Sequence, residues 1–163
     1  MNNADVQQEL GNCASELAHV KTLVDGQGLT SGIVPYLTKY AVIRACGAIE
    51  LSFKAVIADF CSHQSNKQVK RFLERRVRDG SANPSFANMV TLLKDFDEDW
   101  KKKFKAQIEL EPNKANLLTS LQSLVDARND FAHGGNPTAS ISDVLQYFSH
   151  ATRIVELIDS VVI

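Results

Sequence analysis

The chain has too few cysteines to be a disulfide-stabilised or zinc-binding protein. Its three cysteines, Cys13, Cys46 and Cys61, are widely spaced and include no C-x-x-C pair. Disulfide frameworks and structural zinc sites need paired or clustered cysteines. The sequence therefore predicts reduced thiols that are buried as small apolar side chains. We expect neither a metal site nor a cofactor.

Long apolar runs are also missing. No stretch of about 18 consecutive uncharged apolar residues occurs, as a membrane-spanning helix would need. Residues 1–5 have neither the basic start nor the apolar run of a signal peptide. We therefore expect a cytoplasmic protein that does not associate with a membrane.

The charge is balanced, with 18 Lys and Arg against 19 Asp and Glu in 163 residues and a net charge of -1. An overall basic excess, which is typical of nucleic-acid binders, is absent, so any such binding must use local patches. Basic side chains gather in residues 67–78 and 101–105, although such runs are usually solvated faces. The length predicts a single domain over residues 1–163.

Apolar residues recur with a helical period throughout the chain. The expected helices cover residues 6–24, 33–60, 66–79, 84–105, 113–133 and 140–158. Long helices joined by short breaks predict an all-α, antiparallel bundle of four to five main helices. The helix over 33–60 is apolar on nearly every side, so we expect it to run through the middle of the fold, against the helix over 113–133.

Two local features are predicted from sequence near the middle of the chain. Asn83 is a good N-cap and Pro84 suits the first turn of the helix that follows. In the basic helix over 66–79, Val69 and Phe72 are expected to point inward together with Leu73 and Val77.

An arginine interrupts the apolar stripe of the helix over 113–133. The stripe consists of Leu117, Leu121, Leu124, Val125, Phe131 and Ala132, and Arg128 falls at its centre. A guanidinium cannot lose its charge, so on a core-facing stripe it must meet a carboxylate, a subunit interface or an anionic ligand. Glu50 is the natural carboxylate partner. A buried Arg128–Glu50 pair with a purely structural role is the main alternative to a functional arginine.

His133 closes the same helix, directly before Gly134 and Gly135. On an ideal helix it lies about 140° around the axis from Arg128, and it shares a side with Asn129 instead. A site that uses both Arg128 and His133 must therefore form at the helix end, or across two copies of the helix in a two-fold dimer.

Residues 128–134, Arg-Asn-Asp-Phe-Ala-His-Gly, resemble the R-x4-6-H motif of HEPN domains. Residues 44–51, Arg-Ala-Cys-Gly-Ala-Ile-Glu-Leu, are similar to the glycine-then-glutamate helix of the RiboL-PSP-HEPN branch. The resemblance covers the whole chain as an architecture, and these two segments make it specific.

The resemblance implies a homodimeric, metal-independent endoribonuclease that leaves a 2',3'-cyclic phosphate and acts as a toxin or a defence or stress effector. By that analogy His133 activates the ribose 2'-hydroxyl or protonates the leaving oxygen, and Arg128 stabilises the charge of the phosphorane. The implied partners are a second copy, an RNA substrate and an antitoxin or other protein regulator. The implied supporting residues are Asn129, which orients the phosphate or the histidine, together with Asp130, Glu50 and Arg44.

One position departs from the pattern of HEPN toxins that are paired with a nucleotidyltransferase antitoxin. Those toxins tend to have a tyrosine two places after the histidine, where this chain has Gly135. Control by tyrosine modification is therefore not expected here. The alternative function is a non-catalytic HEPN-like dimer that binds RNA, a nucleotide or a protein partner, because active and inactive members can share a fold.

Overall fold

The computed structural model describes residues 1–27, 31–135 and 138–163, and within these ranges it is all-helical. The elements are α1 (Ala4–Gln27), α2 (Val34–Ser62), α3 (Lys67–Leu73), the π-helical turn η1 (Glu74–Arg78), α4 (Phe86–Phe96), α5 (Glu98–Leu110), α6 (Lys114–Ala132) and α7 (Ile141–Val161). The predicted all-α fold class is confirmed. None of the described helices is long and apolar enough to cross a membrane.

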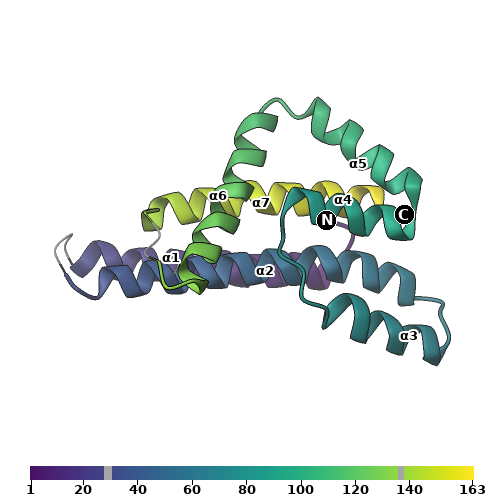
Figure 1. The fold of residues 1–163 in the computed structure, drawn as a ribbon, viewed down its shortest axis with the longest axis horizontal. Helices are drawn as coiled ribbons and strands as arrows, with labels where there is room; N and C mark the ends of the chain where they lie inside the picture. The colour runs from purple at the N-terminus through teal and green to yellow at the C-terminus, as the bar shows by residue number, and fades with distance from the viewer. Residues whose placement is uncertain (28–30, 136–137) are drawn as a thin grey trace.

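The helix α2 is the centre of the bundle and contacts α1, α6 and α7. Figure 1 shows α1 and α7 running along α2, while α6 crosses steeply so that its C-terminal end reaches α2. The expected packing of the helix over 33–60 against the helix over 113–133 is confirmed, and α7 completes the same core. The buried side chains of this core include Phe53 and Ile57 from α2, Leu121 from α6 and Ile154 from α7.

The first helix follows its apolar period closely. Its six apolar residues at steps of three and four are all buried: Val6, Leu10, Cys13, Leu17, Val20 and Val24. A single stripe of this kind buries one face of a surface helix, and here that face lies against α2 and α7.

The expected single helix over 84–105 is wrong, because the chain breaks at Asp97 into α4 and α5. Asp97 has an extended backbone, with φ -155° and ψ 119°. Its Oδ1 accepts hydrogen bonds from the backbone N–H of Asp99 at 2.6 Å and of Trp100 at 3.3 Å. An aspartate that caps a new helix in this way competes with continuation of the old one.

The start of α4 also differs from expectation. Ser85 is the N-cap, and its hydroxyl accepts a hydrogen bond from the backbone N–H of Asn88 at 3.2 Å. Asn83 is therefore not the cap that the sequence predicted. Its side chain contacts α6 instead.

The short helix α3 and the turn η1 project from the end of α2 (Figure 1). Leu73 and Val77 are buried as predicted, but Val69 is 41% and Phe72 60% exposed, so the inward prediction for these two is wrong. Both α3 and η1 contact α2, and Leu73 and Val77 are buried in a small cluster with Ala58 of α2, whereas Val69 and Phe72 lie outside this cluster.

We expect Asp97→Ala to lower the free energy of unfolding by about 1 kcal/mol, because the first turn of α5 loses the acceptor of two backbone donors. The measurement is urea unfolding followed by circular dichroism. Asp99→Ala is the matched control. Asp99 is an exposed carboxylate two positions along that pairs with exposed Lys102, so its removal should have a much smaller effect. Equal losses in the two variants would contradict the capping role.

Candidate active site

The motif lies at the C-terminal end of α6, where the chain turns sharply. The backbone N–H of His133 donates to the carbonyl of Asn129 at 3.1 Å, and that of Gly134 donates to the carbonyl of Phe131 at 3.0 Å. Gly134 has φ +82°, in the left-handed region that ends many helices and favours glycine. The turn leaves the His133 side chain exposed, directly beyond the last helical residue.

Position 135 requires glycine because the backbone carbonyl of Asp130 lies close to it. Its N–H donates to the carbonyl of Asp130 at 2.7 Å, and a Cβ at this position would lie 2.8 Å from the same carbonyl oxygen. Glycine is therefore favoured at the two positions for different reasons: at Gly134 by the positive φ, and at Gly135 by the close carbonyl of Asp130. Asp130 itself is exposed and takes part in the turn through its backbone.

Arg128 lies near the end of α6 and faces α2. Its Nη1 donates to Oδ1 of Asn129 at 3.3 Å. Burial raises the pKa of the Cys46 thiol to about 11, and the charge of Arg128 opposes that rise, which shows that the guanidinium is within electrostatic reach of this part of α2. Among the described residues Arg128 has no ion pair with a carboxylate. Its positive charge is thus not neutralised within the described part of the protomer.

Arg128 is not at the centre of the buried stripe, as the sequence predicted. It is half-buried, whereas Ala127 beside it is buried. Leu117, Leu121, Leu124 and Val125 are buried as expected, but Phe131 is half-buried and Ala132 exposed, so the apolar stripe ends before the motif does. Arg128 therefore lies at the edge of the core.

The expected Arg128–Glu50 pair does not form. Glu50 Oε1 accepts a hydrogen bond from Lys54 Nζ at 3.0 Å and another from the backbone N–H of Ala82 at 3.1 Å. Lys54 is only 3% exposed and also donates to the carbonyl of Gly80 at 2.7 Å. The carboxylate has a closer cation one helical turn away on its own helix. Glu50 thus holds the segment between η1 and α4 against α2.

Arg44 faces α1. It forms ion pairs with Glu9 at 3.0 Å and with Glu16 at 2.8 Å, and Tyr40 also donates a hydrogen bond to Glu16. The hydrogen bonds from Tyr40 and Arg44 hold the pKa of Glu16 below its usual value. These contacts join α1 to α2, and a supporting role of Arg44 in catalysis remains a prediction.

The structure adds a residue that the sequence did not indicate. Asn83, in the segment between η1 and α4, donates through Nδ2 to Oδ1 of Asn129 at 3.3 Å. Helical periodicity cannot place a loop residue beside a helix that is 46 positions away in the chain. The described site thus contains Arg128, Asn129 and Asn83 in one hydrogen-bonded row, with His133 beyond it at the helix end.

The profile of the RiboL-PSP-HEPN family matches residues 8–163, which is nearly the whole chain. The chain belongs to the RiboL-PSP-HEPN family. The resemblance carried by residues 44–51 and 128–134 is thereby confirmed. Comparisons with curated proteins and with solved structures find no match. Membership of the HEPN family suggests an RNA-related or nuclease role.

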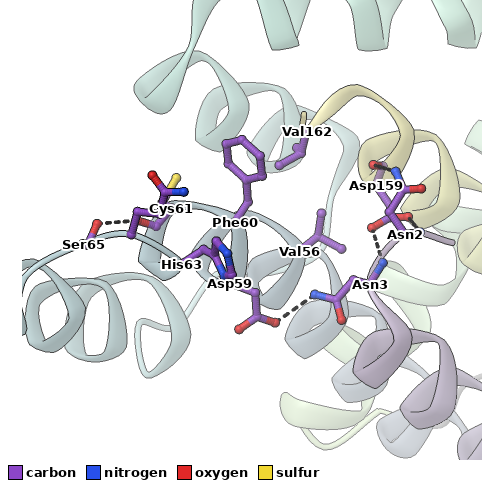
Figure 2. Close-up of a pocket in the computed structure, with 11 residues that line it drawn as sticks. Asn2, Asn3, Val56, Asp59, Phe60, Cys61, His63, Ser65, Asp159 and Val162 are labelled. Atoms are coloured by element: carbon purple, nitrogen blue, oxygen red, sulfur yellow. Dashed lines mark hydrogen bonds between the residues drawn. The ribbon is translucent and has the colours of Figure 1, made fainter.

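The pocket shown in Figure 2 lies elsewhere in this HEPN domain, between the N-terminus and the C-terminal ends of α2 and α7. It has a volume of about 620 Å³, and no motif residue lines it. Asp159, only 3% exposed, accepts hydrogen bonds from the backbone N–H groups of Asn2 and Asn3. Asp59 accepts from the Asn3 side chain and from Arg78. These carboxylates tether the N-terminus, so the pocket is not the candidate active site.

The described residues include no group of three or more His, Cys, Asp and Glu side chains placed to hold a metal ion. The thiols of Cys13 and Cys46 are buried, and burial raises the pKa of each to about 11. They are therefore protonated and unreactive near neutral pH.

We expect Gly134→Ala to lower the free energy of unfolding by about 1 kcal/mol, because a Cβ strains a residue at positive φ. Gly11→Ala is the control. Gly11 lies inside α1, and a Cβ there meets nothing within 4 Å, so alanine should stabilise the protein by about 0.5–1 kcal/mol. Thermal and urea unfolding of both variants measure the difference. A stabilising effect of Gly134→Ala would show that the left-handed turn after His133 does not form.

Proposed function

We propose that this HEPN domain is a metal-independent endoribonuclease. The observation that carries the proposal is Arg128: a half-buried guanidinium without a carboxylate partner among the described residues, at the helix end that carries exposed His133. A buried salt bridge would have given this arginine a structural role, and Glu50 is committed to Lys54 instead. An unneutralised arginine of this kind suits an anionic ligand, and RNA supplies phosphate.

In the proposed reaction the ribose 2'-hydroxyl oxygen attacks the adjacent phosphorus and the bond from phosphorus to the 5'-oxygen breaks. A base takes the proton of the 2'-hydroxyl, and the departing 5'-oxygen gains a proton, which leaves a 2',3'-cyclic phosphate and a 5'-hydroxyl end. His133 performs one of these proton transfers. Arg128 stabilises the negative charge that develops on the phosphoryl oxygens.

Asn129 has a defined part in this scheme. Its Oδ1 accepts hydrogen bonds from Arg128 and from Asn83. The remaining polar group of its side chain is Nδ2, which can only donate. Asn129 can therefore hold Arg128 with its oxygen while its nitrogen donates to a phosphate oxygen.

The proposed functional unit is a homodimer. One face of α2 carries an apolar stripe with exposed side chains, and Gly47, where a Cβ would meet nothing within 4 Å, lies on the same face. We define the α2 stripe as Tyr36, Tyr40, Ile43, Gly47 and Leu51. Spacings of four, three, four and four place these residues on one side of a helix, and a glycine there lets a second helix approach closely.

The α2 stripe lies beside the motif. Lys39 Nζ lies 5.4 Å from the centre of the Phe131 ring, and Cys46 is within electrostatic reach of Arg128. Both Lys39 and Cys46 border the stripe on α2. Helical spacing points Arg128 and His133 in different directions. A second copy on the stripe would place a second Arg128 and a second His133 beside the first pair, so that residues of both copies can share one groove at the interface. An antitoxin or other protein regulator is the alternative occupant.

We expect His133→Ala to abolish RNA cleavage while melting stays near that of wild type, because His133 is exposed and contributes little to packing. Arg128→Ala should also abolish cleavage. It should fold, because a half-buried arginine without a carboxylate partner leaves no buried charge unpaired when it is removed. The measurement is cleavage of an RNA panel in EDTA, with melting and molecular-mass determination on the same samples.

The proposal fails if wild type cleaves none of these RNAs, or if His133→Ala cleaves as fast as wild type. The non-catalytic binding function would then take its place. A substrate with a 2'-O-methyl group at the cleaved position should resist cleavage, as should DNA, because both lack the attacking hydroxyl. Cleavage of either substrate would rule out 2'-hydroxyl attack.

We expect Ile43→Glu to convert the dimer to monomers and to remove cleavage, because it places a charge in the α2 stripe. Leu110→Glu is the matched control: Leu110 is 82% exposed at the end of α5, outside the stripe, and Ile43 is 45% exposed. Light scattering after size exclusion measures the mass of each variant. A dimeric Ile43→Glu, or a wild type that is monomeric at all concentrations, would contradict the proposed interface.

A further inference from the structure

Asn83 lies outside the motif and contacts it through a hydrogen bond. It lies between η1 and α4, and its Nδ2 is 3.3 Å from Oδ1 of Asn129. It caps no helix, because Ser85 caps α4. Its own Oδ1 is buried and has no hydrogen-bond partner among the described residues. A buried amide with one oxygen unsatisfied costs stability, so a purely structural benefit does not account for it.

The orientation of both amides follows from the chemistry of Arg128. A guanidinium can only donate hydrogen bonds, so Asn129 must turn its oxygen toward Arg128. Asn83 contacts that same oxygen and must therefore present its NH2 group. This order of donors and acceptors fixes the side chain of Asn129: the oxygen faces Arg128 and Asn83, and the nitrogen faces away from both.

The backbone around Asn83 is held by α2. Lys54 donates to the carbonyl of Gly80 at 2.7 Å, and the N–H of Ala82 donates to Glu50 at 3.1 Å. Lys54 and Glu50 also pair with each other at 3.0 Å, and Lys54 is almost fully buried. These contacts anchor the chain just before Asn83. They connect Glu50, which does not touch Arg128, to the motif through the backbone.

We infer that Asn83 is a positioning residue for the proposed ribonuclease reaction, acting through Asn129. By donating to Oδ1 of Asn129, it keeps that oxygen on Arg128 and keeps Nδ2 of Asn129 available to the phosphate. The Glu50–Lys54 pair supports this arrangement by holding the segment that carries Asn83. The inference rests on the proposed function, because it assigns Asn83 a part in the same site.

The test compares Asn83→Ala and Asn83→Asp in the full-length chain. Asn83→Ala should lower kcat about tenfold, the lower end of what the loss of an outer-shell hydrogen bond costs an active site, with KM little changed. Asn83→Asp should lose more, although it keeps the shape of asparagine. Its carboxylate needs a donor, so it either turns the amide of Asn129 or draws Arg128 away. Asn83→Ala should melt near wild type, because it removes the unsatisfied Oδ1 together with one hydrogen bond.

Ser81→Ala is the matched control, because Ser81 is exposed on the same segment. It should leave kcat and KM unchanged. The decisive comparison places Asn83→Ala in an Asn129→Ala background. If Asn83 acts through Asn129, the second change has no further effect on kcat. A structural role alone predicts the opposite pattern: losses that add in the double variant and track the melting temperature, with Asn83→Asp milder than Asn83→Ala.

A second measurement separates this inference from the proposed function. The side-chain amide resonances of Asn129, observed by 1H–15N NMR without RNA, should shift in Asn83→Asp and stay in place in Ser81→Ala. Unchanged Asn129 resonances in Asn83→Asp, or full kcat in Asn83→Ala, would overturn the positioning role while wild type still cleaves. A wild type that cleaves no RNA would overturn the proposed reaction, and the catalytic part of Asn83 with it, even if the resonances shift.

Discussion

The placement of the motif depends on the packing of α2 against α6 and α7. Side chains on the inner face of α2 are fully buried, among them Ile49, Phe53 and Ile57, and Leu121 and Leu124 of α6 are buried with them in the same core. Burial of each such side chain stabilises the folded state by about 1.5–3 kcal/mol. This packing fixes the direction of α6 and the point where its end meets α2. Arg128 and Asn129 lie within this helix near its C-terminal end, so they are held on a rigid element.

Lys54 and Arg128 differ in how their positive charges are paired. Lys54 is almost fully buried and is satisfied by a carboxylate and a backbone carbonyl. Burial of an ion pair is costly unless its hydrogen bonds are complete. Here the hydrogen bonds of Lys54 and Glu50 to Gly80 and Ala82 hold a non-helical segment against α2. Arg128 is less buried and has only an amide oxygen as its described partner. Among the described residues, the fold therefore pairs the charge of Lys54 with a carboxylate and gives Arg128 no such partner.

One part of the candidate site is held between packed segments, and the other part is exposed. Arg128, Asn129 and Asn83 form a row that is supported on both sides by packed segments. His133 lies beyond the helix, where the left-handed Gly134 redirects the chain. In the proposed dimer, a second protomer on the apolar face of α2 would complete the arrangement of Arg128 and His133 at this helix end.

Much of the fold could be predicted from sequence because helix periodicity is local. The stripe of α1, the central position of α2 and the motif at the end of α6 all followed from spacing, and the RiboL-PSP-HEPN resemblance followed from two short segments. Competition between local signals was harder to judge. Asp97 and Ser85 both became N-caps, where the pattern favoured one continuous helix capped by Asn83.

The sequence by itself determined the helices and the residues of the motif, since both depend on neighbours within about one or two turns. The tertiary structure decided the partners: Glu50 with Lys54 and Ala82, and Asn83 with Asn129, in contacts that reach up to 46 positions along the chain. It also decided which apolar faces are covered, because spacing shows that a face is apolar but not whether another helix packs on it. The sequence pattern suggested Glu50 as the partner of Arg128. In the structure Glu50 pairs instead with Lys54, which lies one turn away on α2.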